Sequence, residues 1–418
     1  MPQENKKKER VKKMIKFGKW VVKFRIPILI LSFLLLIPTG IIYMNTRINY
    51  DILSYLPGDI ETMKGQDILL DEFGTGAFSV AVIDGMQEKE ISQLEDKLKE
   101  IDHVKDVLWY GALADISIPM DMLPDDLKDS LQNADTGSQL MIITFDTSMS
   151  ADETLDAIEE IRGLTNEQCL LSGMSAVVTD IKKICNSEVI MYVVIAAGLS
   201  ALVLALTMDS FLLPFIFLLS IGMAIVYNLG TNFIAGEISF VTQALAAVLQ
   251  LAVTMDYSIF LWHSYLENQE RYPDDKKRAM SHAISQTLTS VVGSSITTIA
   301  GFLAMCFMTF TLGMDLGIVM AKGVVFGVVG CVTILPAMIL AMDKWIEKTR
   351  HKAIIPDLGR IGGFVTKHYW IFIILFLVII GPAFYGQNHN QVYYDLVGTL
   401  PDNLESVKAG NALENDFD

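Results

Sequence analysis

Metal ligands and nucleophile motifs are scarce in this sequence, and their scarcity excludes several classes of site. The 418 residues include four cysteines and six histidines, and Cys169, Cys185, Cys306 and Cys331 lack the spacing of a zinc site. We therefore expect no metal and no cofactor. No Walker-type glycine loop and no nucleophile–base set occurs, so the sequence predicts neither a nucleotide-driven pump nor an enzyme. Whether Cys169 and Cys185 pair stays open, because pairing requires an oxidising compartment.

Basic charge is also lacking over the longest polar stretch. The formal net charge is −16, and residues 47–188 carry 29 acids against 10 bases, a balance of −19. A nucleic-acid-binding surface needs the opposite sign, so no nucleic-acid partner is expected. Solubility alone accounts for this acidity, and repulsion of anionic lipid headgroups is the alternative.

Long apolar runs are abundant. Apolar residues make up 52% of the chain and the mean hydropathy is +0.41, values above those of a soluble domain. Seven runs are long enough to cross about 30 Å of hydrocarbon. They lie at 26–46, 189–207, 211–230, 237–262, 288–311, 315–342 and 369–387. The sequence thus predicts a polytopic α-helical membrane protein.

Lysine and arginine set the expected orientation. Bases gather in 1–25, between the fourth and fifth runs, and in 343–368. These three segments fall on one side if the spans alternate, and basic loops stay in the cytoplasm. We therefore predict a multi-pass protein of the cytoplasmic membrane with a cytoplasmic N-terminus (1–25), a bundle over 189–342, a basic cytoplasmic loop (343–368) and an outer domain over 47–188.

One segment occurs twice. Residues 17–74 align with residues 361–418 at a constant offset of 344, with 14 identities in 58 positions. A long-period repeat indicates a duplicated architecture, which in membrane chains is typical of transporters. We expect residues 388–418 to begin a second, truncated outer domain and to be poorly packed. The remaining C-terminal half is then an expected partner.

The outer segment has the pattern of an α+β domain. Strands are expected at 78–83, 104–110, 140–145 and 169–171, and amphipathic helices at 87–101 and 151–163. A polar insertion with Pro119 and Pro124 separates the second and third strands. The order β-α-β-β-α-β is the split ferredoxin-like pattern.

Asp256 is the candidate functional residue. It lies inside the fourth apolar run and is followed by Tyr257. A carboxylate there costs on the order of 3 kcal/mol by insertion scales, so such residues are usually functional. Burial favours the protonated form, and reversible protonation is the expected chemistry. The alternative is a permanently protonated Asp256 that bonds to a neighbouring helix.

Polar neighbours of Asp256 are expected from the fifth apolar run, 288–311. Ser294, Thr297 and Thr298 share a helix face at i, i+3 and i+4, although hydroxyl groups also serve simply to pack membrane helices. Lys322 in the sixth run is a further charged candidate, either supporting Asp256 or extending its ammonium to the interface.

The plan and several local segments resemble the resistance–nodulation–division (RND) superfamily, in its MMPL-like branch. The matching segments are 50–57, 171–176, 255–257, 294–302 and 335–337. The resemblance implies a proton-driven secondary transporter that exports lipids or other hydrophobic compounds, with Asp256 and Tyr257 in the proton relay. The family often has glycines just before the aspartate, where this chain has Ala252 and Thr254.

Two functional hypotheses therefore remain. In the first, the partners are protons, membrane lipids and a lipid-like substrate. In the second, the chain is a non-transporting lipid-sensing scaffold or a protein-secretion accessory of RND-like architecture. A homo-oligomer is compatible with both.

Overall fold

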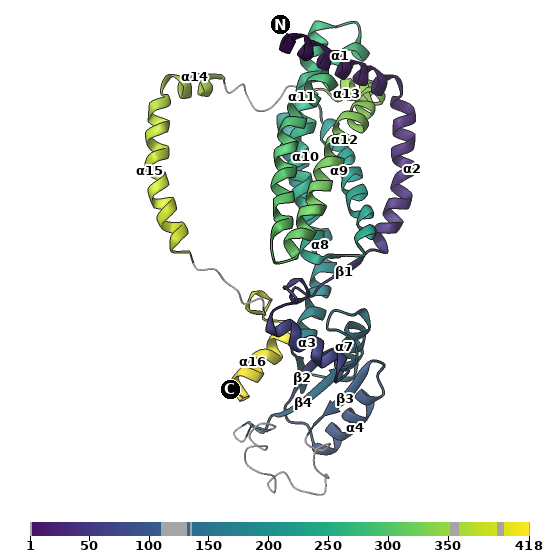
Figure 1. Cartoon of the computed structure of the whole chain (residues 1–418), viewed down its shortest axis with the longest axis vertical. Helices are drawn as coiled ribbons and strands as arrows, with labels where there is room; N and C mark the ends of the chain where they lie inside the picture. Colours follow the sequence, from purple (N-terminus) through teal and green to yellow (C-terminus); the bar gives the residue numbers. More distant parts are fainter. Residues whose placement is uncertain (1, 110–131, 134–135, 352–358, 391–396, 418) are drawn as a thin grey trace.

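Seven apolar helices dominate the structure. The computed structural model describes residues 2–109, 132–133, 136–351, 359–390 and 397–417 (Figure 1). Within them, seven helical segments are long and apolar enough to cross a membrane: Arg25–Met44, Met174–Thr207, Leu213–Ile234, Phe240–Arg271, Lys276–Phe307, Leu312–Ala341 and Tyr369–Asn388. Each contains or overlaps one predicted span, which confirms a polytopic helical membrane protein.

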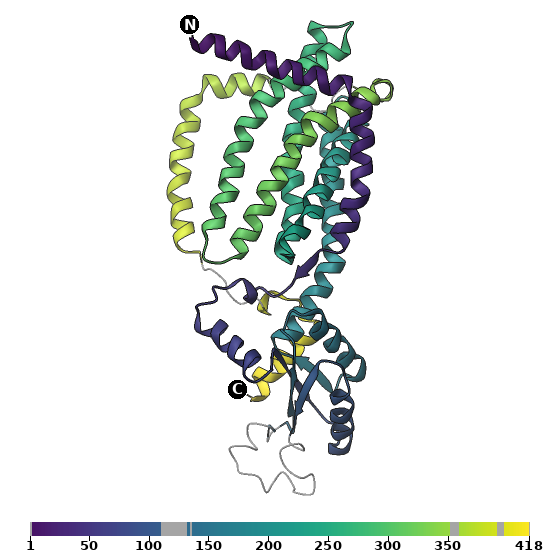
Figure 2. The same ribbon diagram turned by 45° about the vertical axis from the view of Figure 1, so that its right-hand side comes forward.

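Five of these helices form a bundle with the first span beside it. The helices are α2 (Arg25–Met44), α8 (Met174–Thr207), α9 (Leu213–Gly230), α10 (Phe240–Arg271), α11 (Lys276–Ala304) and α12 (Leu312–Ala341). Helix α1 (Pro2–Lys23) lies across one end of the bundle and packs on α11 (Figures 1 and 2). Short helices α13 (Asp343–Lys348) and α14 (Gly359–Lys367) follow α12 at the same end.

Several helices extend beyond the predicted spans. Helix α10 continues past Trp262 to Arg271, and α11 begins at Lys276. Polar bonds hold this extension: Gln286 Oε1 accepts from Ser264 Oγ at 2.6 Å and from Asn268 Nδ2 at 2.7 Å. The hydropathy pattern missed the extension because polar residues such as Asn268 and Gln286 interrupt its apolar ones.

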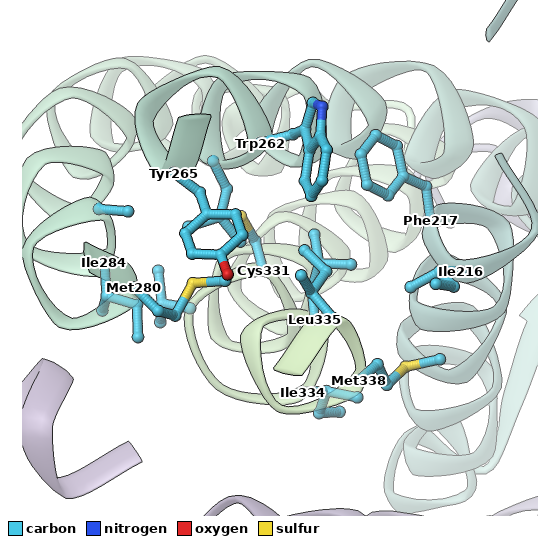
Figure 3. Close-up of a cluster of buried hydrophobic side chains, with 14 of the residues drawn as sticks. Ile216, Phe217, Trp262, Tyr265, Met280, Ile284, Cys331, Ile334, Leu335 and Met338 are labelled. Carbon is cyan, nitrogen blue, oxygen red and sulfur yellow. The ribbon is translucent and has the colours of Figure 1, made fainter. Parts of the chain in front are cut away.

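The aromatic core of the bundle lies towards the α1 end. Trp262 and Tyr265 of α10 pack with Phe217 of α9 and Leu335 of α12, and all four are buried (Figure 3). Trp262 Nε1 also donates to Asp209 Oδ1 at 2.9 Å. The indole is therefore packed and hydrogen-bonded, which fixes the loop between α8 and α9.

At the opposite end lies a four-stranded antiparallel sheet, here called the sheet domain (residues 77–172). Its elements are β2 (Ala77–Ile83), α4 (Glu88–Lys99), β3 (Val104–Leu108), β4 (Gln139–Phe145), α7 (Asp152–Leu164) and β5 (Cys169–Ser172). The strand order is β3-β4-β2-β5. Alternate residues of β4, such as Met141, Ile143 and Phe145, are buried with residues of both helices, including Leu98 and Ile158. The insertion around Pro119 and Pro124 lies outside the described residues.

A two-stranded parallel pair connects the bundle to the sheet domain. Strand β1 (Arg47–Asn49) follows α2, and β6 (Glu237–Ser239) precedes α10. Helix η1 (Leu53–Tyr55) and helix α3 (Glu61–Asp71) follow β1, and helix η3 (Thr231–Ala235) precedes β6. Neither short strand was predicted, since three residues carry too little pattern.

The repeat is visible in the structure. Helix η5 (Val397–Thr399) matches η1, and α16 (Glu405–Phe417) begins at the residue that aligns with the start of α3. Helix α15 (Tyr369–Asn388) matches α2, and none of its span is buried in this chain. The two copies of the repeated segment are therefore similar in local structure as well as in sequence.

Helix α16 corrects one expectation. It was expected to be poorly packed, but it lies along the edge strand β5, with Ser406, Val407 and Ala409 buried. Glu405 Oε1 accepts from Leu171 N at 3.2 Å, so the carboxylate satisfies a backbone donor of the edge strand. An exposed edge is an aggregation hazard, and α16 covers this one.

Glycine lets α12 approach α10. A Cβ at Gly327 would lie 2.0 Å from Thr254 Cγ2, and one at Gly323 would lie 2.9 Å from Gln250 Oε1. The family often has glycine on the helix with the aspartate, where this chain has Thr254. Here the glycine is on the facing helix.

We expect Gly327→Ala to destabilise the bundle by about 1–3 kcal/mol, because the added methyl overlaps Thr254. Thr254→Ser removes the overlapping methyl and should restore most of the loss in the double variant. Thermal unfolding in detergent measures both. Gly301→Ala is the matched control: it adds a methyl on α11 with no atom within 4 Å, and an unchanged or higher melting temperature is expected. Equal losses for both glycines would contradict the packing argument.

Candidate functional site

Asp256 lies on a face of α10 that the rest of the chain leaves open. Its side chain is exposed, and so are Leu245, Leu249 and Phe260 on the same face. Within the described part of the chain no hydrogen bond or ion pair involves Asp256. No other described helix therefore covers the Asp256 carboxylate, and its burial in the hydrocarbon of the membrane stays a prediction.

Tyr257 points the other way, into the bundle. It is 7% exposed, and its Oη accepts a hydrogen bond from Ser295 Oγ of α11 at 3.1 Å. Cys331 Sγ of α12 donates to the Tyr257 carbonyl at 3.3 Å. Tyr257 thus joins α10 to both neighbouring helices one residue after the carboxylate.

The predicted hydroxyl groups are not bonded to Asp256. Ser294 Oγ donates to Val291 O at 3.0 Å, and Thr297 and Thr298 both donate to Ser294 O, at 2.7 and 3.1 Å. Ser294 and Thr297 are exposed. Their bonds to their own helix leave each hydroxyl oxygen with acceptor capacity on an open face.

A buried polar network, which sequence reasoning missed, crosses the bundle. Asn228 Nδ2 of α9 donates to Gln250 Oε1 of α10 at 2.9 Å, and Thr254 Oγ1 donates to Gln250 O at 2.6 Å. Asn228 is 0% and Gln250 1% exposed. Amide side chains inside two apolar spans were the available signal, since such groups require partners.

Lys322 does not support Asp256; it lies near the end of α12 that faces the sheet domain, as the alternative interpretation expected. Its ammonium donates to Asn232 Oδ1 of η3, at the end of the bundle nearest the sheet domain. Helix α12 begins ten residues earlier, at Leu312. Lys322 and Asp256 are not bonded to each other, and the structure places them in different surroundings.

The junction with the sheet domain is held by backbone and side-chain bonds. Thr311 donates to Tyr55 O from its backbone N at 3.0 Å and from its Oγ1 at 2.9 Å. Asp315 Oδ2 accepts from Ser239 N at 2.9 Å and from Thr242 Oγ1 at 2.6 Å, at the start of α10. An acid there is stabilised by the helix dipole. These bonds therefore hold the start of α12 to η1 and to the start of α10.

Ionisable groups of the junction have shifted pKa values. Burial raises the pKa of Asp51, although its carboxylate accepts from Leu53 N at 2.8 Å. Burial also raises the pKa of Tyr55, and the nearby Asp315 carboxylate raises it further. Both groups are thus held in their neutral forms more than in water.

Neither a metal-binding cluster nor a disulfide is present among the described residues. Among the described residues no cluster of three or more histidine, cysteine or carboxylate side chains is placed to hold a metal. All four cysteines are free thiols, so Cys169 and Cys185 are unpaired.

The described chain is a multi-pass membrane protein with a mixed α/β domain inserted between its first and second spans. Residues 74–368 match the MMPL family, and the chain belongs to that family. This confirms the resemblance drawn from the sequence.

Curated relatives are longer than this chain. It is 24% identical over 366 residues to the probable transport protein MmpL12 of Mycobacterium tuberculosis, covering 84% of this chain and 30% of that protein. It is 22% identical over 387 residues to the putative membrane protein YdgH of Bacillus subtilis, covering 87% of this chain and 41% of the relative. The chain thus spans about a third of MmpL12 and two fifths of YdgH.

A solved structure is also similar. The crystal structure of SecDF in its super-membrane-facing form aligns with a TM-score of 0.41 and 14% identity, covering 78% of this chain and 39% of that chain.

Proposed function

We propose that this chain forms part of a proton-driven secondary transporter that exports lipids or other hydrophobic, amphiphilic compounds across the cytoplasmic membrane. The observation that carries the proposal is Asp256: a carboxylate without a partner among the described residues, on an open face of a membrane helix and next to a tyrosine fixed in the bundle. Inserting a carboxylate into lipid costs several kcal/mol, so an aspartate inside a membrane helix is usually functional.

The proposed mechanism couples the charge on Asp256 to helix packing. A neutral carboxyl tolerates apolar neighbours, whereas a carboxylate requires water or a donor. Protonation then favours a packing in which the open face of α10 is dry, and deprotonation favours a hydrated one. Only such a difference in proton affinity between two packings can drive a cycle.

The arrangement of the chain across the membrane supports coupling of this change in helix packing to export. We propose that this end lies in the cytoplasm, and the positive-inside rule supports it, because α1, the α10–α11 loop and the segment after α12 are rich in basic residues. The sheet domain then lies outside, and we propose that it is a ferredoxin-like porter domain. The bond from Thr311 to Tyr55 O connects the spans to η1, which precedes that domain in the chain.

Transport in vesicles under an imposed pH gradient tests the function. The protein, expressed from its own gene and reconstituted, should move a fluorescent lipid analogue between leaflets faster when the outer side is acidic. A protonophore should abolish the difference. Equal rates with and without the gradient would reject proton coupling and favour the scaffold or secretion-accessory alternative. No enzymatic activity is proposed.

A further inference from the structure

A cavity of about 420 Å³ lies where the bundle meets the junction with the sheet domain. Its apolar wall includes Ile234, Met314 and Ile318, which are 79%, 47% and 48% exposed. In a membrane, side chains exposed on the outside of a bundle face hydrocarbon. The cavity is therefore open sideways, towards the leaflet on the sheet-domain side.

Lys322 forms the deepest charged part of the wall. Its ammonium has three donors and bonds to Asn232 Oδ1, and in the described part of the chain no carboxylate lies within 4.0 Å of it. Asn232 is 2% exposed, and its Nδ2 has no hydrogen-bond partner among the described residues. Asn232 Nδ2 thus lacks an acceptor in the described part of the chain, and the adjacent ammonium has donors beyond the one bonded to Asn232 Oδ1.

Carboxylates lie nearer the mouth. Asp315 is seven residues before Lys322 on α12, about 10 Å along the axis and on the same face. Glu237 Oε1 accepts from Asn49 Nδ2 at 3.0 Å, and its Oε2 lies 3.6 Å from Arg47. Helical side chains lean towards the N-terminus of their helix, so Lys322 extends towards the acids without pairing with them.

We propose that this cavity binds the headgroup of a zwitterionic lipid with a phosphate and a primary ammonium. The phosphate accepts from Lys322 and Asn232, and the ammonium lies between Asp315 and Glu237. The acyl chain leaves past Ile318 into the leaflet. The order of charges agrees with a lipid of this leaflet, in which the phosphate lies nearer the chain than the ammonium does. The site is separate from Asp256, and the inference does not depend on proton coupling.

Native mass spectrometry of the purified protein with four single-chain probes tests the site. The probes are oleoyl lysophosphatidylethanolamine, oleoyl lysophosphatidylcholine, oleate and monoolein, which share one acyl chain. We expect lysophosphatidylethanolamine to bind at least about tenfold tighter than monoolein, a ratio typical of hydrogen bonds to charged groups. It should also bind more tightly than the choline lipid, which has no N–H donor for the acids, and than oleate, which has no ammonium.

Variants separate the site from general lipid adsorption. Lys322→Gln should lower affinity for lysophosphatidylethanolamine at least about tenfold and leave monoolein unchanged. Lys322→Arg should retain most of the affinity, and Lys344→Gln, an exposed lysine at the opposite end, should change nothing. Unchanged affinity in Lys322→Gln, or equal binding of monoolein, would overturn the site. Equal binding of the ethanolamine and choline lipids, or tighter binding of oleate, would overturn the zwitterionic assignment.

Discussion

Asp256→Asn should reduce gradient-driven transport at least about tenfold while the protein stays folded. The amide has nearly the same volume but does not titrate, so the two packings no longer differ in proton affinity. One elementary charge moved through 100 mV is worth about 2.3 kcal/mol, and that coupling is lost. Asp256 makes no hydrogen bond or ion pair in the described chain, so the substitution removes none that holds the bundle together.

Two controls define the result for Asp256. Tyr257→Phe removes the bond from Ser295 but leaves the carboxylate, so transport should fall less. Asp67→Asn neutralises an exposed carboxylate on α3 and should have no effect. Transport and surface abundance are measured together in vesicles. Undiminished transport by Asp256→Asn would exclude the proton role and leave a residue without an assigned task.

The second large effect is expected in the sheet domain. Asp180→Ala should destabilise it by about 3–5 kcal/mol, because the change leaves a largely buried guanidinium, on a side chain that is 14% exposed, without its main partner. Arg162 Nη1 and Nη2 donate to Asp180 Oδ1 and Oδ2 at 2.7 and 3.0 Å, and the Asp180 side chain is 4% exposed. Arg162 Nε also lies 3.2 Å from Glu405 Oε2, and Ser406 N donates to Asp180 Oδ2.

Limited proteolysis and thermal unfolding measure this loss. Since Asp180 holds both Arg162 and the start of α16, α16 should become protease-sensitive first. Asp152→Ala is the control: Asp152 pairs with Lys182 at 3.3 Å, but its side chain is 64% exposed, and such pairs contribute about 1 kcal/mol or less. A melting temperature equal in both variants would contradict the importance of the buried pair.

Periodic features of the fold could be predicted from the sequence, whereas contacts between distant segments could not. Seven apolar runs gave seven helices, and alternation in 140–145 gave β4, because each pattern is local. Ser294 was expected near Asp256, but the adjacent Ser295 is the residue of α11 that bonds to α10, at Tyr257. Adjacent residues on a helix point about 100° apart. The depth of a serine in the membrane therefore does not tell which hydroxyl group faces α10.

The open face around Asp256 was missed for a different reason. A charged residue in an apolar run predicts function but not which neighbours cover it. The same limit applies to Lys322, whose partner Asn232 lies 90 residues away. Asn232 follows an apolar span and had no distinguishing pattern.

The bond between Leu171 and Glu405 can form only some time after Leu171 has been synthesised. The two residues are 234 positions apart, and at about 5–20 residues per second the ribosome needs roughly 10 to 50 s to make that length. Strand β5 is therefore complete, with its edge unpaired, long before α16 exists. During that interval six further spans enter the membrane. A chaperone or membrane-insertion factor that shields β5 until α16 arrives would protect the nascent chain from edge-to-edge aggregation.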